Sequence, residues 1–441
     1  MTLPSDQAMG ADRDRLAGRL AAALNELTDV DLLLDRILSD ARSLVAAEAG
    51  SVYLKSGEDA LVLAICQNSY LERIVGGRGE LPFLNYIIKL DRGSLAGYSV
   101  LEGEPLVVDN TLDIDPDAPY QHNTAIDNST NYVSQAVMTL PLISAPGETL
   151  GAIQLINPLD EGFRVKRFTG EDLAAESFYV GIAAKALAKS MMFRSMAVRS
   201  VEVVSAHDPQ ETPAHAQRVA CVATELYEHW AARRSVPEGE RLRILDMLPL
   251  AAMLHDVGKM SVPTAVLTKP GRLDLRERAL MEAHVLIGAR LYRKARTPLD
   301  RLTFQVILDH HERWDGQGYP GWVDIDTGQP LPGRAGPGGR VQGKRGGEIS
   351  IYGRILAVAD VFDALVSRKT YKDSFDESLS IQIMEQESGH HFDPEVVESL
   401  IARRNVLRKI QERFPDHLET SELAGEAPLS KAPVAYPAFK Y

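Results

Sequence analysis

His255 and Asp256 carry the clearest chemical signal in this chain of 441 residues. They directly follow the apolar segment LRILDMLPLAAML, whose composition favours a helix. An imidazole nitrogen can bind one metal ion, whereas a carboxylate has two oxygens and can bridge a pair of ions. Lys259 follows one helical turn after Asp256 and is a candidate contact for a phosphate oxygen. A lone His-Asp pair is common by chance, so its interpretation depends on the residues that accompany it.

Further metal-binding side chains occur in separate segments on both sides of this pair. Upstream, Glu211 stands four residues before His215, a spacing that places both on one face of a helix. Downstream, the candidate ligands are His284, His310, His311 and Asp360. Five of the eleven histidines therefore fall in this set. Such a set can hold two metal ions with Asp256 as the bridge, and Glu211 can complete a third site.

The elements that position these residues follow from hydrophobic spacing. After Ala206 and up to about Arg413, helix-forming segments dominate, which predicts an all-helical unit. Before it, a helix over residues 24–44 with Thr28 or Asp29 as its cap is followed by strand-like runs. These runs span residues 50–54, 60–66, 106–108, 136–143 and 149–156. A small sheet with helices packed on it, enclosing a pocket, is expected, so the fold class is α+β with several domains.

A long helical stretch over residues 169–204 separates the two regions. Val180, Ala184, Leu187 and Met191 recur along it at spacings of three and four. This stripe either packs against its own domain or forms a parallel helix pair in a homodimer. Both alternatives remain open from the sequence, because Ser195 and Ser200 interrupt a strict heptad.

Composition excludes several classes of protein. The formal net charge of -13 argues against binding to a nucleic acid polymer. No run approaches eighteen apolar residues, and the N-terminus has no secretory pattern, so we expect a cytoplasmic protein without a membrane span. Cys66 and Cys221 lie in different regions with apolar neighbours, which predicts two buried thiols.

The second region resembles the HD-GYP family, a branch of the HD phosphohydrolases. The resemblance covers about 200 residues in ordered blocks. These blocks are HDVGK at His255 to Lys259, LTKPGRL at Leu267 to Leu273, His284 with Gly288, HHERWDGQGYP at His310 to Pro320, DVFDAL at Asp360 to Leu365 and SGHHFDPEVV at Ser388 to Val397.

The resemblance implies hydrolysis of cyclic di-GMP to pGpG, or on to GMP, by a hydroxide bound to metal. It also implies two or three divalent ions, with iron or manganese expected from an imidazole- and oxygen-rich site. The first ion would be held by His215, His255, Asp256 and Asp360. The second would be held by Asp256, His284, His310 and His311. Glu211 would complete a third site, and Asp256 and Lys259 are the expected catalytic residues.

The same resemblance suggests which residues meet the substrate and where this chain departs from the family. Gly318 and Tyr319 of the GYP loop are expected to shape the pocket. Lys259, Lys369 and Lys372 are candidates for phosphate contacts. The family commonly has arginine in place of Lys369 and proline in place of Thr370, and lysine binds phosphate only as a point charge.

An apparent insertion between Pro320 and Ile349 is a second departure from the family. It is rich in glycine and carries Arg334, Arg340, Lys344 and Arg345. We favour a flexible, solvated excursion at residues 321–348. A basic lid over an anionic substrate, or a docking surface for another protein, is the alternative.

Residues 12–190 resemble a GAF domain. The similarity rests on the opening helix, SLAGY at Ser94 to Tyr98, EGEPLVVDN at Glu102 to Asn110, LPLIS, and GAIQLIN at Gly151 to Asn157. The signature that some nucleotide-binding members carry after the last strand is incomplete here. We therefore expect a GAF sensor whose small-molecule ligand is unidentified.

Together these features predict a GAF sensor over residues 12–190 with a connecting helix to about 205, an HD-GYP domain over 200–415 and a flexible tail over 416–441. The leading hypothesis is a GAF-regulated, homodimeric cyclic di-GMP phosphodiesterase. One alternative is a weakly active adaptor that binds partners such as diguanylate cyclase proteins, and another is a hydrolase of a different cyclic nucleotide or dinucleotide.

Of the remaining histidines, His122, His207, His229 and His417 are expected at the surface or in caps, and His390 and His391 at the start of a helix.

Overall fold

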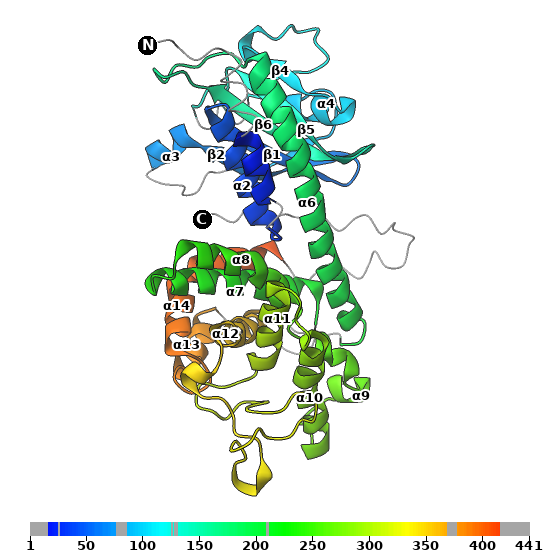
Figure 1. Ribbon diagram of the computed structural model, residues 1–441, viewed down its shortest axis with the longest axis vertical. Helices are drawn as coiled ribbons and strands as arrows, with labels where there is room; N and C mark the ends of the chain where they lie inside the picture. Colours follow the sequence, from blue (N-terminus) through cyan, green and yellow to red (C-terminus); the bar gives the residue numbers. More distant parts are fainter. Residues whose placement is uncertain are drawn as a thin grey trace. The chain divides into compact units, whose positions relative to one another are not determined.

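The computed structural model describes residues 16–24, 27–75, 86–124, 127, 131–208, 211–367 and 377–414. The described residues form two compact units that divide between Phe193 and Arg194. The first unit contains a sheet with helices, and the second is built from helices and loops (Figure 1). This arrangement confirms the expected α+β class.

The first unit is organised around a six-stranded sheet with the order β3-β2-β1-β6-β5-β4. Each pair of neighbouring strands is antiparallel. The strands are β1 (Ala47–Ser56), β2 (Ala60–Asn68), β3 (Ile87–Lys89), β4 (Leu106–Val108), β5 (Val137–Ala145) and β6 (Glu148–Pro158). The short strand β3 is absent from the sequence-based prediction, whereas β4, which is equally short, was expected.

Alternation along the strands gives this sheet two different faces. Val52 and Leu54 of β1 point into a core shared with α2 (Val30–Leu44) and the first half of α6 (Gly170–Ser205). Ser51 and Tyr53 of the same strand line a pocket on the opposite face. Asp29 caps α2 by accepting hydrogen bonds from the amides of Asp31 and Leu32, so one of the two expected caps is confirmed and α2 begins at Val30.

Shorter elements complete the first unit on the pocket side. Helix α4 packs against β5 and β6, and Ser94 caps it by accepting from the amide of Gly97. These elements are α3 (Ser69–Val75), α4 (Leu95–Glu102) and the single 3-10 turn η1 (Thr111–Asp113).

The second unit contains helices that pack around α7. Helix α7 contacts α8, α12 and α14, and α11 contacts α8, α10 and α12. The α-helices after α6 are α7 (Pro213–Arg233), α8 (Glu238–Met253), α9 (Thr264–Leu267), α10 (Leu275–Tyr292), α11 (Pro298–Asp309), α12 (Ile351–Val366), α13 (Glu377–Gln386) and α14 (Pro394–Arg413). The 3-10 segments are η2 (Val257–Ser261), η3 (Pro337–Gly339) and η4 (Gly346–Glu348). Within the described residues this unit has no named strand, as the sequence predicts.

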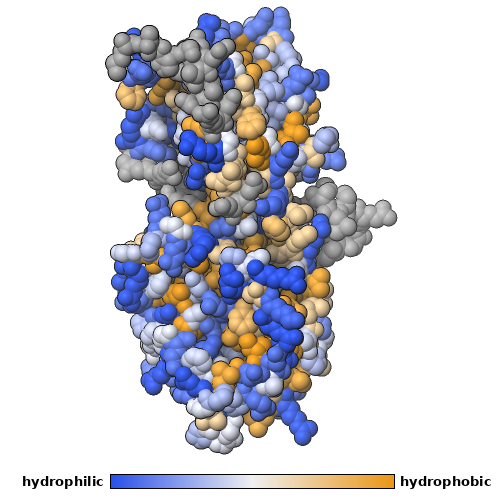
Figure 2. Space-filling model, in the orientation of Figure 1, coloured by the Kyte–Doolittle hydropathy of each residue, from blue (hydrophilic) through white to orange (hydrophobic). Residues whose placement is uncertain are grey.

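Surface character agrees with the bulk composition. Hydrophilic residues cover most of the face drawn in Figure 2, with hydrophobic residues scattered between them. Among helices in the described ranges, none has the combination of length and hydropathy needed to cross a bilayer.

Two glycines allow η2 to approach α10 more closely than side chains would permit. A Cβ atom added to Gly258 would lie 2.0 Å from the carbonyl oxygen of His284 and 2.8 Å from the amide nitrogen of Gly288. These distances are far below van der Waals contact, so the backbones would have to separate. The close approach therefore fixes the distance between His255-Asp256 and His284.

We predict that Gly258→Ala destabilises the second unit by about 1–3 kcal/mol, because overpacking at a backbone contact forces the chains apart. Chemical denaturation followed by a probe in this unit measures the change. Gly239→Ala in α8 is the matched control, since an added Cβ there meets nothing within 4 Å. Equal unfolding midpoints for the two variants would contradict the steric argument.

Candidate metal centre

The end of α8 and the 3-10 turn η2 present Asp256 to two groups of histidines. Its Oδ2 atom lies 3.2 Å from Nε2 of His255 and 2.7 Å from Nζ of Lys259. Its Oδ1 atom lies 3.1 Å from Nε2 of His284 on α10 and 3.5 Å from Nε2 of His310, which directly follows α11. Each carboxylate oxygen therefore faces a different group of imidazoles.

His311 completes the group on the Oδ1 side. One ligand atom from each of Asp256, His284, His310 and His311 lies within 4.8 Å of the others. The ring of His311 stacks on Tyr319, with centroids 4.8 Å apart, and the amide of Tyr319 donates to its carbonyl oxygen. The GYP loop therefore supports this side of the site directly.

The group on the other side consists of Glu211, His215 and His255, whose ligand atoms also lie within 4.8 Å of one another. Nε2 of His215 is 3.7 Å from Glu211 and 3.4 Å from Asp360 of α12. The spacing of Glu211 and His215 suggested that both lie on one helix, but Glu211 does not lie on α7. It precedes the cap of α7, where the Thr212 hydroxyl accepts from the amide of His215, and this turn brings the two side chains together.

Three of the imidazoles are oriented by their own local backbone. Nδ1 of His255, His284 and His310 lies 2.8, 2.5 and 2.8 Å from the carbonyl oxygen three residues earlier. These carbonyls belong to Ala252, Met281 and Ile307. A proton on Nδ1 leaves the Nε2 lone pair directed at the centre of the site, as in metal-binding histidines.

Unsatisfied polar atoms test whether metal ions fit this site. Nε2 of His255, His284 and His310 and Oδ1 of Asp256 are buried and have no hydrogen-bond partner among the described residues. Lone pairs on nitrogen and carboxylate oxygen repel one another at 3.1–3.5 Å unless a cation lies between them. The donor set therefore fits divalent metal ions, and its nitrogen and oxygen atoms suit iron or manganese.

Asp256 remains ionised despite its burial. Desolvation raises the pKa of its carboxyl group, but the ammonium of Lys259 and the neighbouring imidazole of His255 lower the pKa well below its usual range. Burial and the neighbouring His310 and His284 lower the pKa of His311 well below its usual value. Asp256 therefore keeps its negative charge, and His311 keeps its neutral ring, as metal coordination requires.

Lys259 lies between carboxylates. Its Nζ atom is 2.6 Å from Glu211, 2.7 Å from Asp256 and 3.5 Å from Asp208. Burial lowers the pKa of Lys259, but Asp256 and Glu211 raise it well above its usual value, so the ammonium stays charged. Asp208 is buried beside this site, and no sequence motif identifies it.

A buried ion pair orients His215 from behind. Nδ1 of His215 lies 2.8 Å from Oδ2 of Asp363, and Arg218 donates to both oxygens of Asp363 at 2.7 and 3.0 Å. Burial raises the pKa of Asp363, but His215 and Arg218 lower it to about 2. Asp363 stands three residues after Asp360 in DVFDAL, so helical spacing could have identified it.

The structure places only some of the expected substrate contacts. Gly318 lies in a tight turn, since an added Cβ would be 2.3 Å from the amide nitrogen of Arg313. Tyr319 stacks on His311, as described above. Lys369, Thr370, Lys372 and the expected tail over 416–441 lie outside the described residues.

The segment over residues 321–348 is folded against the second unit and is not the solvated excursion that its composition favours. Backbone bridges join Val323 to Pro330 and Ala335 to Val341. The amide of Trp322 donates to the carbonyl of Gln342 at 2.9 Å. Glycines do not loosen this segment, because their positive φ angles allow the tight turns that close it.

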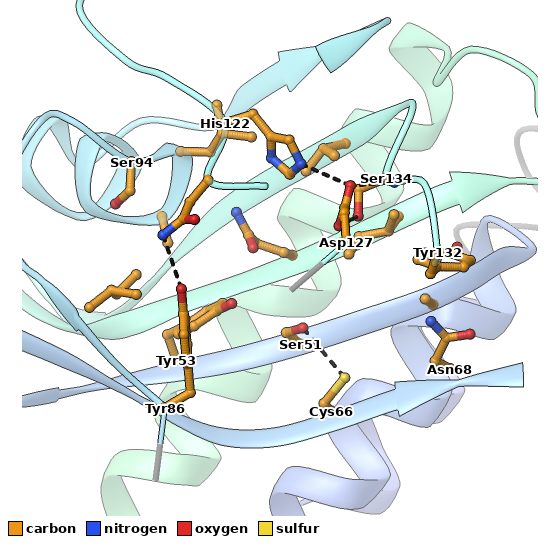
Figure 3. Close-up of a pocket in the computed structure, with 18 of the residues that line it drawn as sticks. Ser51, Tyr53, Cys66, Asn68, Tyr86, Ser94, His122, Asp127, Tyr132 and Ser134 are labelled. Atoms are coloured by element: carbon orange, nitrogen blue, oxygen red, sulfur yellow. Dashed lines mark hydrogen bonds and ion pairs between the residues drawn. The ribbon is translucent and has the colours of Figure 1, made fainter. Parts of the chain in front are cut away.

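A second pocket lies on the open face of the sheet in the first unit and has a volume of about 790 Å³ with its mouth included (Figure 3). Asp127 lies 3.1 Å from Nε2 of His122 and accepts from the hydroxyl of Ser134 at 2.8 Å. The side-chain amide of Asn123 donates to the hydroxyl of Tyr86 at 3.0 Å. The lining in the described part of the chain contains no lysine or arginine.

Several histidines and cysteines outside the centre have structural contacts. His122 lines the pocket of the first unit and is not a surface or capping residue. His207 and His229 are partly buried, with ring nitrogens 2.6 Å from the carbonyl oxygen of Val262 and 3.0 Å from the hydroxyl of Ser399. His417 lies outside the described residues.

The remaining two histidines make backbone contacts, and the two cysteines are free thiols. The carbonyls of His390 and His391 accept from the amides of Asp315 and Trp314. Cys66 and Cys221 are free thiols, and burial raises the pKa of Cys66 to about 11.

We predict that Asp363→Asn weakens metal binding by about 10–100-fold, because a neutral amide no longer fixes the His215 ring. Arg218 also loses its buried counter-charge, which destabilises the fold by about 3–5 kcal/mol. Calorimetric titration with Mn²⁺ and chemical denaturation measure the two effects. Because the folded pKa lies below the unfolded one, this stabilisation is complete above about pH 3.9 and is lost as the pH falls through the folded pKa.

Glu398→Gln is the control for this substitution. It removes an exposed charge paired with Arg233, so stability should change by no more than about 1 kcal/mol. Unaltered Mn²⁺ affinity in Asp363→Asn would show that this residue does not orient a ligand.

Comparison with known proteins supports both halves of this description. Residues 29–187 match the family model of the GAF domain, and residues 213–365 match that of the HD domain. A second HD domain model matches residues 335–396. These matches confirm the GAF and HD assignments made from the sequence.

Curated relatives are similar to about half of this chain. The 3'3'-cGAMP-specific phosphodiesterase 2 of Vibrio cholerae is 37% identical over 208 residues, which cover 47% of this chain and 34% of the relative. A cyclic di-GMP phosphodiesterase of the same organism is 33% identical over 51% of this chain and 42% of the relative. A cyclic di-GMP phosphodiesterase of Thermotoga maritima is 32% identical, covering 52% and 54%.

The chain spans about a third to a half of the length of these relatives. The HD match lies within the unit that carries the candidate metal-binding side chains. The chain is therefore similar to the GAF domain over residues 29–187 and to the HD domain over residues 213–365, and about half of it is similar to bacterial cyclic dinucleotide phosphodiesterases.

Proposed function

We propose that this protein is a metal-dependent phosphodiesterase that hydrolyses a cyclic dinucleotide. The observation that carries the proposal is the position of Asp256, whose two oxygens face imidazole nitrogens of two separate groups. A carboxylate in this position is suited to bridge two metal ions. The similarity of the same unit to phosphodiesterases of cyclic di-GMP and 3'3'-cGAMP supports the choice of substrate class.

Two divalent ions, with iron or manganese preferred, would polarise a phosphate ester and lower the pKa of a water molecule when bound. His284, His310 and His311 would hold one ion with Asp256, and His215, His255 and Asp360 would hold the other. Glu211 provides an oxygen for a third. The protein itself supplies fixed imidazole orientations and a buried, negatively charged cradle.

Lys259 is proposed to neutralise carboxylates at the centre and, when substrate is present, to contact its phosphate. Its ammonium lies within 2.7 Å of both Glu211 and Asp256, so it neutralises charge at the centre. A phosphate group that approaches the ions would compete with these carboxylates for the same ammonium. Gly318, Tyr319, Lys369 and Lys372 are the further candidates for substrate contact.

Two substrates are compatible with these observations. The cyclic di-GMP assignment follows from the HD-GYP motifs and from two of the relatives described above. The relative at 37% identity is specific for 3'3'-cGAMP, which favours the mixed dinucleotide as a second candidate. The products would be the linear dinucleotide, such as pGpG, or the mononucleotides.

We predict that the protein loaded with Mn²⁺ or Fe²⁺ hydrolyses at least one of these two dinucleotides. In Asp256→Asn the rate should fall by more than about 100-fold, beyond the usual effect of losing an outer-sphere partner. His255→Ala should show a similar loss. Separation of the products by liquid chromatography measures the rate and distinguishes linear dinucleotide from mononucleotide.

His390→Ala is the matched control, because it removes an exposed imidazole from the same unit and should leave the rate unchanged. If the protein binds two ions and hydrolyses neither dinucleotide, the enzyme proposal is wrong and the adaptor hypothesis gains support. Rapid hydrolysis by Asp256→Asn would exclude Asp256 as the bridge.

The GAF domain is proposed to regulate this activity through α6. This helix runs without interruption from residues that pack on the sheet, such as Tyr179 and Leu187, to Ser205 in the second unit. A ligand in the pocket of the first unit would act on strands that contact the same core. The described lining residues include Asp127 and neither lysine nor arginine, so we propose an uncharged or cationic ligand.

Exposed hydrophobic residues on α6 support a homodimer. Phe178, Met192, Met196 and Val203 expose between 49% and 57% of their surface, and heptad spacing separates Met196 from Val203. Apolar side chains at this spacing are typical of a helix that pairs with a second copy. The stripe of Val180, Ala184, Leu187 and Met191 packs in the core of the first unit, so the first of the two alternatives holds for those residues. The dimer is proposed from this second, exposed stripe of α6.

We predict that the double substitution Met192→Lys and Met196→Lys converts the dimer to a monomer, because it places charge within the apolar stripe. Light scattering coupled to gel filtration measures the mass. Glu202→Lys introduces the same charge at another exposed position of α6 and should leave the dimer intact. A double variant that remains dimeric would show that the stripe is not the interface.

A further inference from the structure

Two buried carboxylates bracket the histidine pair of the metal centre. Asp309, the last residue of α11, directly precedes His310, and Glu312 directly follows His311. Both residues are at most 4% exposed. Neither belongs to the two groups of metal-binding side chains.

Lys344, in the second half of the inserted segment, contacts both of these carboxylates. Its Nζ atom pairs with Oδ1 of Asp309, and its amide donates to Oε2 of Glu312 at 3.1 Å. Lys344 is itself buried, and its ammonium lies 5.7 Å from the centre of the Trp322 ring. One residue therefore holds the chain on both sides of the histidine pair.

The remaining acceptors of the two carboxylates hold neighbouring segments. Oε1 of Glu312 accepts from the amide of Gly321 at 2.5 Å, where the insertion begins. Oδ2 of Asp309 accepts from the amide of Ser350 at 2.9 Å, which caps α12. Both ends of the insertion are thus fixed to the residues that flank the histidines.

The insertion also contacts the helix that carries His284. Arg290 of α10 donates to the carbonyl oxygens of Ile325 and Asp326 at 2.7 and 3.2 Å. Arg293 of the same region pairs with the carboxylate of Asp326. The segment therefore joins α10, the end of α11 and the start of α12.

We propose that Lys344 is a positioning residue for the metal centre, and that the insertion is a fixed strap rather than a lid. Its ammonium and amide hold Asp309 and Glu312 and thereby keep His310 and His311 directed at Asp256. A buried lysine is stable only when paired, so this contact has one preferred geometry. The inference rests on the metal-binding function proposed above.

The first test is Lys344→Met, which keeps the apolar stem and removes the ammonium. We expect the ion at His284, His310 and His311 to bind about 10–100-fold more weakly, the effect typical of losing an outer-sphere partner. Metal content after dialysis against a chelator, and the Mn²⁺-dependent rise in the unfolding midpoint, should both decrease. The kcat for the dinucleotide should fall while KM stays constant.

Arg340→Met is the matched control, since it makes the same kind of change at an exposed position of the same segment. It should leave metal content, kcat and KM unaltered. Lys344→Arg keeps the positive charge and should restore part of the metal retention that Lys344→Met loses. If Lys344 contributed only to stability, the loss of metal would be accompanied by a lower unfolding midpoint of the metal-free protein. A positioning role lowers metal retention without that change.

Should Lys344→Met fail to fold because Asp309 is left unpaired, the double variant Asp309→Asn with Lys344→Met removes both charges together. We expect this variant to fold and still to lose the ion more readily. Full metal retention and normal kcat in either folded variant would overturn the proposal. A raised KM with unchanged kcat would also overturn it, because that result indicates a lid that acts on substrate.

The metal measurements are independent of substrate turnover. If the unmodified protein binds the ions and hydrolyses neither dinucleotide, the proposed function fails. Retention of metal by the Lys344 variants then still decides whether the strap positions the histidine pair.

Discussion

Excess negative charge in a confined space governs the second unit of this protein. Four buried carboxylates gather near the centre, where Lys259 and Arg218 pair with them. These carboxylates belong to Asp208, Glu211, Asp256 and Asp363. Charges buried in this way are stable only beside opposite charges, so the arrangement requires further cations. Neutral imidazoles with inward lone pairs are suited to share divalent ions with these oxygens.

The packing of the helices follows from this requirement. The ligands come from α7, α10, α12 and the segments after α8 and α11, so the helices must meet within a few ångströms. Gly258 allows the turn after α8 to touch the backbone of α10. Gly353 does the same for α12, where an added Cβ would lie 2.3 Å from Cβ of Asp309. Small residues at these contacts and ion pairs behind the ligands therefore both keep the candidate ligands at short distances from one another.

The sequence was sufficient to predict which side chains meet at the centre and most of the elements that carry them. Motifs with a fixed order identify His255, Asp256 and His310 because the residue types and their order are specific. Alternation of apolar residues predicted the main strands, and Asp29 was a candidate cap from its position. These features depend on local patterns, which a single sequence records directly.

Features that depend on distant contacts could not be predicted. Lys344 pairs with Asp309, 35 residues away, and no motif links them. The glycine-rich composition suggested flexibility, but Gly321 is needed because an added Cβ would lie 2.3 Å from the carbonyl of Gln342. Glu211 has helical spacing to His215, yet α7 begins only after its cap at Thr212. The first two cases depend on contacts between residues far apart in the sequence, and the third depends on where the helix begins.

The carbonyl acceptors behind His255, His284 and His310 have a consequence for how the centre is assembled. Each ring is held by a carbonyl three residues earlier in its own chain segment, and therefore does not depend on the ion for its orientation. Preorganised ligands bind an ion without the cost of ordering side chains. An ion that dissociates therefore leaves behind a receptor of nearly unchanged shape, which can be refilled without refolding. The identity of the resident metal would then follow the supply of ions in the surroundings and not the order of events during folding.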